Sequence, residues 1–234
     1  EGIGDISLMF GWKREYLQPV DLFEFIRLCV KFGATLPTGV ETYHNHPFSI
    51  PNGNNGHFGF PFRFDIVSGL SHDIFIGFHV GLQFFKDEKI DHCRAKTDLN
   101  QNGFIKLADC VVNSKKGNIL DINTHIKLDH FCKGLSTLAG YTFTRQARDN
   151  WTLIDKRAHT TTTNIINSDS TLFQWTMHTL NLWTEYDFGT HAFFKKRSWH
   201  PKISAFYNYP FDGKNIFVAP GIGGSAGVCL KFKY

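Results

Sequence analysis

The chain has 234 residues, of which 24 are phenylalanine and 20% are charged, and its formal net charge is +4. This length fits one domain, the small net charge argues against a nucleic-acid partner, and no apolar run reaches the roughly 18 residues of a membrane-spanning helix. Five cysteines without a CxxC pair indicate neither a disulfide framework nor a zinc site.

Alternating apolar and polar residues mark the first two predicted strands, over residues 5–13 and 26–36. Residues 37–55, rich in Pro, Gly and Asn, are expected to form a long loop. Because a strand already begins near Gly2, no signal peptide is recognised, and an exported protein would be present here in mature or cropped form.

The clearest alternation runs from Gly56 to Lys86 and predicts a hairpin with a short turn at residues 69–73. Each arm keeps the pattern for about ten residues, which exceeds an ordinary strand and suffices for a tilted strand to cross a bilayer. The even-numbered apolar residues are therefore predicted to contact lipid. The members of this set that we single out are Phe60, Phe62, Phe64, Phe78, Val80 and Leu28.

The second half of the chain repeats this arrangement. Long polar loops are expected over two segments, residues 87–118 and 147–170. A bulge is expected near Thr179, where the apolar alternation changes phase. The predicted strands in this half are 120–129, 139–144, 173–186, 203–209 and 226–234.

Nine strands joined alternately by short turns and long loops predict an all-β fold. The segregation of loop lengths is typical of an antiparallel transmembrane β-barrel of about 10–12 strands, with short turns on one rim and long loops on the other. Because nine is odd and such bacterial barrels have even counts, either upstream strands are missing or a loop hides a further strand. We favour missing upstream strands, with residues 1–234 forming a single barrel domain.

The last ten residues resemble the C-terminal signature of Gram-negative outer-membrane proteins, an amphipathic strand that ends in an aromatic residue. The positions that match are Val228, Leu230, Phe232 and Tyr234. A strand containing Gly4-Asp5, a strand ending in Pro37-Thr38-Gly39 and the Gly-rich segment Gly53–Gly56 resemble a transporter family associated with phenol-degradation pathways. These resemblances imply a bacterial outer-membrane location and recognition by the barrel-assembly machinery.

Asp98 to Asp109 is similar to a calcium-binding loop of the EF-hand or dockerin type. Its candidate oxygen ligands are Asp98, Asn100, Asn102 and Asp109, and its two carboxylates predict weak Ca²⁺ binding in an external loop. The alternative is an ordinary polar loop. Cys93 and Cys110 bracket the segment, and whether they pair as a disulfide is left open by the sequence.

Charged residues lie between the apolar ones and are predicted to line a water-filled lumen. The candidates are Arg27, Lys31, Arg63, Asp65, Lys127 and Arg145. Rings of charge tune ion preference in a wet pore, whereas in a plugged lumen such charges would pair and conduct nothing. A basic excess over the inferred inward positions, Lys231 and Lys233 included, predicts a mild preference for anions.

Two further patterns point to other chemistry only weakly. Gly223 to Gly227 fits a GxSxG nucleophile motif, but a strand follows where a hydrolase needs a helix. His44 and His46 lie in a loop without a third metal ligand.

The sequence therefore predicts a pore for small solutes in the outer membrane, with no enzyme activity and no resident cofactor except the calcium considered above. The first alternative is a soluble, lipocalin-like barrel that binds a ligand, which would turn its apolar face to the lumen. The second is an outer-membrane enzyme barrel, which would need a Ser, His or Asp cluster that we cannot assemble from the sequence.

Overall fold

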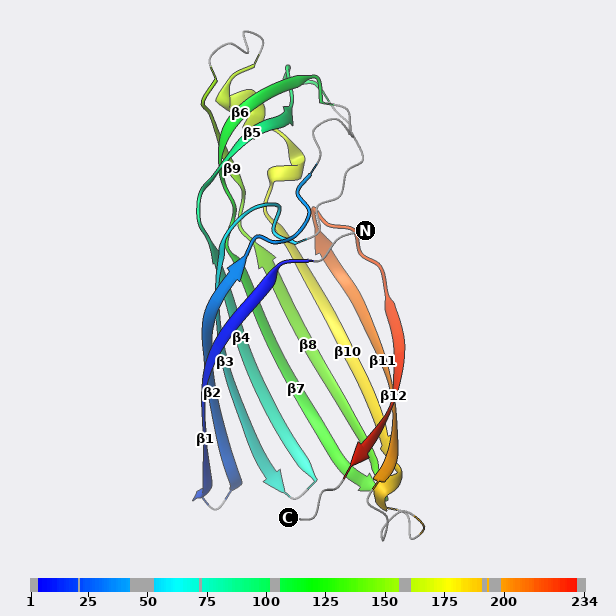
Figure 1. Ribbon diagram of the computed structural model, residues 1–234. Coiled ribbons are helices and arrows are strands. Elements are labelled where there is room, and N and C mark those ends of the chain that lie inside the picture. The colour runs from blue at the N-terminus through cyan, green and yellow to red at the C-terminus, as the bar shows by residue number, and fades with distance from the viewer. Residues whose placement is uncertain are drawn as a thin grey trace.

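The computed structural model describes residues 4–20, 22–42, 53–71, 73–101, 106–155, 161–190, 193 and 199–230. Within these residues the fold is all-β, with two antiparallel sheets (Figure 1). The large sheet has nine strands in the order β1-β2-β3-β4-β7-β8-β10-β11-β12, and the small sheet contains β5, β6 and β9.

The nine strands predicted from the sequence are all found, and together they form the large sheet. Each is 10 to 16 residues long, about twice an ordinary strand. Their bounds are β1 Ile6–Val20, β2 Phe23–Leu36, β3 Gly59–Ser71, β4 Ile74–Phe85, β7 Ile119–Cys132, β8 Leu135–Gln146, β10 Trp175–Asp187, β11 Trp199–Lys214 and β12 Gly221–Leu230.

The connections between these strands are largely segregated by length, as predicted, with one exception at each end. The β1–β2, β3–β4 and β7–β8 connections are each two residues long and lie at the lower end of the sheet in Figure 1. The 3-10 helix η2 (Phe188–Thr190), which follows β10, lies there as well, and the eleven residues between β10 and β11 are the exception in length. The longer connections gather at the opposite end, together with the N-terminus. The β11–β12 connection, residues 215–220, lies at this end although it is only six residues long.

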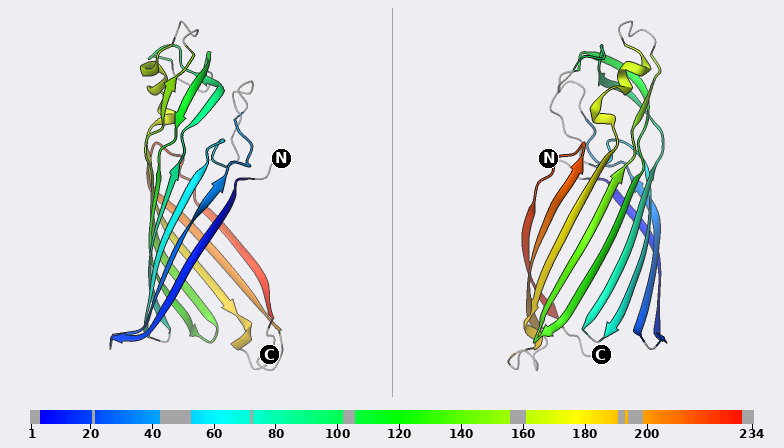
Figure 2. Two further views of the ribbon diagram at one scale, coloured as in Figure 1. Left: turned by 60° about the vertical axis from the view of Figure 1, so that its left-hand side comes forward. Right: turned by 180° about the vertical axis from the view of Figure 1, so that it is seen from behind.

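The two long polar segments are not plain loops, which corrects the sequence prediction. They contain β5 (Glu88–Ala95), β6 (Ala108–Lys115), β9 (Asn150–Leu153), the short helix α1 (Thr163–Asn167) and η1 (Ser170–Leu172). These elements form a cap at the long-loop end of the large sheet, seen in both views of Figure 2. The strands of the cap do not join the large sheet, so they are not the hidden strand considered above.

The apolar core of the described residues lies in the cap. The buried apolar side chains all belong to it: Cys93, Ala95, Ala108, Cys110, Val112, Ile166 and Leu172. Ile90, Trp151 and Leu153 pack against them. The cap is therefore built like a small water-soluble domain, with its apolar side chains inside.

The large sheet has the opposite arrangement. Strand pairing places the even-numbered side chains of β1 to β4 on one face, and several of its apolar members are exposed: Leu8 and Phe10 by 61% each, Phe32 by 61% and Phe60 by 47%. Of the predicted lipid-facing residues, Phe62 and Phe78 are also exposed, whereas Leu28, Phe64 and Val80 are half-buried. We call this side the apolar face. The other side, the polar face, carries odd-numbered residues such as Asp65 and His79, which are partly buried. The predicted alternation of the two faces is thus confirmed.

The bulge predicted near Thr179 is found, but the extra residue is on the neighbouring strand. The pairing of β10 with β11 shifts register between His178 and Thr179, because His178 pairs with Asp212 and Thr179 with Pro210. Phe211 is therefore the inserted residue. Against β8, β10 pairs without interruption. The apolar alternation in the sequence changes near Thr179 because the apolar residues Trp175 and Met177 lie on the polar face, whereas the later apolar residues of β10 lie mainly on the apolar face.

The nine strands are fewer than the 10 to 12 that the sequence predicted for one barrel. In the part of the chain that the structure describes, β1 and β12 are the two edges of the sheet and do not pair with each other. The sheet is twisted and curved into an open trough (Figure 2). Among the same residues, no helix is long and apolar enough to span a bilayer.

Candidate functional site

Polar side chains are joined across the middle of the polar face. The Nδ1 atom of His79 lies 2.6 Å from Oδ1 of Asp65, and its Nε2 atom lies 3.6 Å from Oδ1 of Asp121. Thr144 Oγ1 donates to the other carboxylate oxygen of Asp121 at 2.9 Å. One imidazole on β4 thus bridges two carboxylates on β3 and β7. His79 is absent from the residues predicted above, although its position between Gly77 and Gly81 places it on this face.

A second, uncharged network continues this row toward β10. The side-chain amides of Asn123 and Asn181 both donate to Thr142 Oγ1, each at 2.7 Å. His125 Nδ1 lies 3.1 Å from Asn123 Oδ1, and a Cβ at Gly77 would collide with the His125 ring. Glycine at position 77 therefore provides the space that this imidazole occupies.

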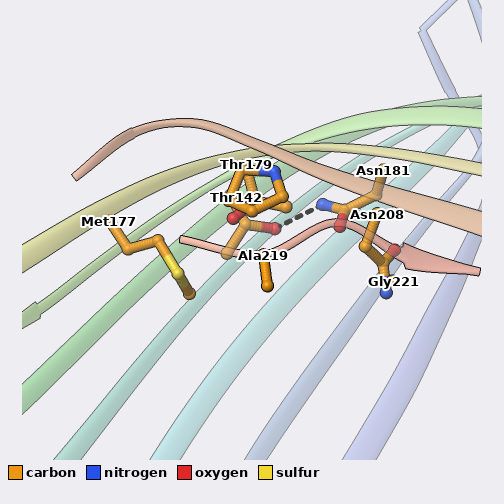
Figure 3. Close-up of a pocket in the computed structure, with 8 residues that line it drawn as sticks. Thr142, Met177, Thr179, Asn181, Asn208, Ala219 and Gly221 are labelled. Atoms are coloured by element: carbon orange, nitrogen blue, oxygen red, sulfur yellow. Dashed lines mark hydrogen bonds between the residues drawn. The ribbon is translucent and has the colours of Figure 1, made fainter. Parts of the chain in front are cut away.

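A hollow of 330 Å³ lies on the polar face beside these amides (Figure 3). It is lined by Thr142, Met177, Thr179, Asn181, Asn208, Pro210, Ala219 and Gly221. Thr179 is buried, and its hydroxyl has no hydrogen-bond partner among the described residues. The polar lining is made of hydroxyls and amides without formal charge, which suits a neutral solute that donates and accepts hydrogen bonds.

Three predicted lumen cations lie close together on β2 and β3, but they are not equivalent. Arg27 forms an ion pair with Glu15 at 2.7 Å. Lys31 and Arg63 are exposed and directly opposite each other in the pairing of β2 with β3. Like charges in that position repel one another. The pair Lys31–Arg63 is therefore a local site of positive potential, whereas Arg27 is neutralised.

The predicted basic excess is not present among the described strand residues of the polar face. Strand pairing places six basic and six acidic residues there: Lys13, Arg27, Lys31, Arg63, Lys127 and Lys202 against Glu15, Asp65, Asp121, Asp129, Glu185 and Asp187. Lys127 contacts Asp129 at 3.1 Å. Lys231 and Lys233 lie outside the described residues. What distinguishes the face is how its charges are distributed.

Arg145 is not a polar-face residue, which corrects the sequence prediction. It pairs with Leu120 of β7, which pairs in turn with Leu82 of β4 on the apolar face. Its guanidinium is exposed at the long-loop end of β8 and donates to Gln174 Oε1 at 3.3 Å. Because side chains alternate along a strand, Arg145 shares the face of Phe143.

A compact ionic cluster lies on the same face near the short-turn end. Lys202 Nζ is 3.0 Å from Asp187 and 3.3 Å from Glu185, and His200 Nε2 is 3.2 Å from Asp187. His200 and Asp187 are both buried. These opposite charges compensate one another and tie β10 to β11 at this rim.

Asp5 organises the opposite rim. Its carboxylate accepts hydrogen bonds from the backbone N–H groups of Gly39, at 2.9 Å, and Asn54, at 2.5 Å. Thr38 Oγ1 donates to the Gly4 carbonyl at 3.1 Å and accepts from the N–H of Ile6 at 3.0 Å. The three segments that carry the resemblance to the transporter family therefore form one hydrogen-bonded cluster.

Lys116 links this cluster to the base of the cap. Its Nζ donates to the carbonyl of Asn54 at 3.1 Å and lies 5.0 Å from the centre of the Phe85 ring. Burial lowers the pKa of Lys116 below the ordinary lysine value, an effect that the nearby carboxylates of Asp149 and Asp5 oppose.

The calcium-like segment is only partly assembled as predicted. Asp98 Oδ1 accepts from the N–H of Asn100 at 2.8 Å, while Asp109 lies in β6 with its carboxylate 3.4 Å from His92 Nδ1. Lys96 Nζ donates to the Leu99 carbonyl at 3.1 Å, which places a cation beside the loop. Asn102 lies outside the described residues. Calcium binding stays a prediction.

The other predicted positions are only partly covered by the structure. Val228 projects from the apolar face of β12 and is 63% exposed. Leu230 ends that strand, its side chain is not described, and Phe232 and Tyr234 lie outside the described residues, as do His44 and His46. Ser225 of the GxSxG pattern lies within β12, with its hydroxyl 2.8 Å from that of Ser204.

Comparison with known proteins adds no family to these observations, because the chain matches no protein-family model and no curated protein sequence.

Proposed function

We propose that the large sheet forms most of the wall of a transmembrane β-barrel in a bacterial outer membrane and that the protein is a passive pore for small solutes. The observation that carries this proposal is the inverted burial of the sheet. Large apolar side chains such as Phe10 and Phe32 are exposed on one face, whereas the ionisable side chains Asp65, His79 and Asp121 are partly buried on the other. Lipid outside and water inside would solvate both faces.

The same inversion argues against a soluble, lipocalin-like barrel. Such a barrel buries its apolar side chains in the lumen and turns its charges to water. Here Phe10 and Phe32 are each 61% exposed, whereas the polar face carries His79 between two carboxylates. In water, the exposed apolar face would be far larger than a monomeric protein usually presents.

The free edges support closure of the sheet in lipid. A bilayer offers no hydrogen-bonding groups, so the unpaired backbone of β1 and β12 would be costly there. With nine antiparallel strands, the two edge strands run in the same direction. An all-antiparallel closure therefore needs an odd number of further strands, and one or three would give the even totals of about 10 or 12. That these strands lie upstream remains a prediction.

The placement of the rims supports an orientation in the membrane. In outer-membrane barrels the short turns face the periplasm and the longer loops face outward. By this rule the cap and the Asp5 cluster are extracellular, and β12 ends at the periplasmic rim. Val228 on the apolar face fits the amphipathic final strand that the assembly machinery would recognise.

Solutes would pass by diffusion along the polar face. The Lys31–Arg63 pair favours anions locally, and the hollow near Thr179 offers neutral hydrogen-bonding groups. A mild anion preference therefore depends on two cations and not on the net charge of the wall, which is balanced among the described strand residues.

Two measurements, made one after the other, test the proposal. The full chain should need detergent to remain dispersed and should change mobility on a gel after heating, because a folded barrel resists unfolding in detergent. Reconstituted into planar bilayers, it should then conduct ions. A protein that stays monomeric in plain buffer would contradict the membrane assignment. A heat-modifiable protein without conductance would retain the barrel and exclude an open pore.

A further inference from the structure

Two cysteines face each other across the small sheet. Cys93 on β5 and Cys110 on β6 are directly paired in the antiparallel register, and their Sγ atoms are 3.4 Å apart. Cys110 Sγ also lies 3.7 Å from the carbonyl oxygen of Cys93. Both side chains are buried in the apolar core of the cap, with 7% and 3% exposure.

We propose that Cys93 and Cys110 form a cross-strand disulfide that ties β5 to β6 and closes the chain segment between them. Bridging requires Cβ atoms that approach each other and sulfur atoms about 2.05 Å apart. Directly paired residues of antiparallel strands have Cβ atoms about 4.5–5.5 Å apart, and the 3.4 Å between the Sγ atoms would close by rotation of the two side chains and a small approach of the strands.

The location of the pair supports oxidation more than metal binding. Within the residues that the structure describes, no three His, Cys, Asp or Glu side chains gather into a metal-binding group. Disulfides persist in oxidising compartments, and the orientation under Proposed function places the cap outside the cell. The inference thus uses that orientation, although the geometry of the sulfur pair does not depend on a pore.

The reaction balances as a thiol–disulfide exchange with a protein disulfide of the thiol-oxidase class. The Cys110 thiolate attacks one sulfur of the oxidant, which releases the first oxidant thiol and leaves a mixed disulfide. Cys93 then loses its proton and attacks the Cys110 sulfur, which releases the second oxidant thiol. Two protein thiols are oxidised to one disulfide, and the oxidant disulfide is reduced to two thiols.

The asymmetry of the pair fits this order of attack. The hydrogen bond between the two sulfur atoms lowers the pKa of Cys110 and, together with burial, raises that of Cys93. Cys110 is therefore the first to become a thiolate, which is the reactive form. Since both side chains are buried, we expect the oxidant to reach Cys110 by local opening of the cap while β5 and β6 stay paired.

The disulfide would enclose the calcium-like segment. Cys93 and Cys110 are 17 residues apart in sequence, and Asp98 to Asp109 lies wholly between them. Closing this segment restricts the unfolded chain more than the folded one. The disulfide would thus hold the external loop in place without contributing an atom to it.

The test is to count thiols in the full chain isolated from its native membrane. The protein is denatured, alkylated with a mass-tagged maleimide with and without prior reduction, and resolved on a gel. Cys29, Cys132 and Cys229 lie on the large sheet and should stay reduced. We therefore expect three tags without reduction and five with it. Peptide mass spectrometry should identify one linked pair that contains Cys93 and Cys110.

Matched variants separate this pair from the other cysteines. Cys93→Ser or Cys110→Ser should give four tags whether or not the sample is reduced, whereas Cys132→Ser should give two without reduction and four with it. Five tags in the unreduced wild-type protein, or a linkage to another cysteine, would overturn the inference. If a serine variant does not accumulate, the wild-type peptide linkage still decides. A bilayer recording without conductance would contradict the pore and leave this count unchanged.

Discussion

Lys31 on β2 and Arg63 on β3 are direct cross-strand neighbours, and glycine is the next paired residue on either side, Gly11 on β1 and Gly81 on β4. The residue that pairs with Lys31 on β1 and the residue that pairs with Arg63 on β4 therefore have no side chain. The Lys31 side chain lies over Gly11, where an added Cβ would be 3.1 Å from Lys31 Cγ, and nearby charge of the same sign makes the potentials of Lys31 and Arg63 additive.

Replacing Lys31 and Arg63 together with Gln should shift the reversal potential of the reconstituted protein toward cation selectivity. The shift should be large at physiological salt, where charges act over about 8 Å, and should shrink at 1 M salt, where the range is about 3 Å. The control replaces Arg27 and Glu15 with Gln, which removes an ion pair and leaves the net charge unchanged. Equal shifts in both variants would show that this pair does not set selectivity.

An arginine on the apolar face should cost far more than one on the polar face. Phe62→Arg is expected to destabilise the protein by about 1–4 kcal/mol, between the costs of a cation near the interface and at the bilayer midplane. Gln83→Arg is the matched control, since Pro61 and Gln83 are paired next to the Phe62–Leu82 pair. Gly81 is less suitable because an added Cβ would lie 3.3 Å from His79 Nε2. Refolding titrations into lipid vesicles compare the two, and similar costs would contradict the membrane assignment.

Removing the Asp5 carboxylate should release the connection between β2 and β3. Asp5→Ala deletes the acceptor of the Gly39 and Asn54 N–H groups, and hydrogen bonds to a charged group each contribute about 1.5–3 kcal/mol. Limited proteolysis should then cut the β2–β3 connection much faster than in the wild type. Asp5→Asn retains one acceptor oxygen and should be intermediate. Unchanged cleavage in both variants would mean that Asp5 does not hold this rim.

The cap should lose stability in acid through Asp169. Burial alone would raise the pKa of Asp169, but hydrogen bonds from Lys106 and Thr171 outweigh it and hold the pKa below the ordinary value of 3.8. Because the folded-state pKa is lowered, the contribution of this ion pair is complete above about pH 4 and is lost as the pH falls through the folded-state pKa. Fluorescence of Trp151, which packs against the cap core, should report the transition.

Substitutions at the same pair give a second measurement on the cap. Lys106→Met leaves a buried carboxylate unpaired and should cost about 3 kcal/mol. The double variant Lys106→Met with Asp169→Leu should recover most of that loss, since it removes both charges. If the single and double variants were equally stable, the pair would be too well solvated to matter.

The strands of the large sheet could be predicted because their side chains obey one period. Phe60, Phe62 and Phe64 recur at every second position, and a one-residue slip would place all of them on the wrong face. The same rule places Arg145 on the apolar face, since it follows Tyr141 and Phe143 at every second position. The prediction that Arg145 lines the lumen was therefore wrong. The sequence prediction weighed its charge above its position.

The cap was missed for a different physical reason. Ala108, Cys110 and Val112 do alternate, but they are small, and the pairing of β5 shifts register between Ile90 and Cys93. Short strands of this kind are stabilised by the elements that pack on them, here α1 and η1, and not by a local pattern. The joining of Asp5 to Gly39 and Asn54 likewise depends on contacts between distant segments, which no local period reveals.

The contrast between the cap core and the apolar face means that the relation between exposure and tolerance of polar substitutions should differ between the two parts of the chain. In the cap, Val112 has no exposed surface, and a polar residue there should be rejected as in any water-soluble domain. On the large sheet, an exposed position such as Phe32 should reject polar residues equally, although substitution tables from water-soluble proteins would rank it as permissive. A saturation mutagenesis map should therefore show two regimes, and their boundaries should fall where β4 passes into β5, β6 into β7, β8 into β9, and η1 into β10.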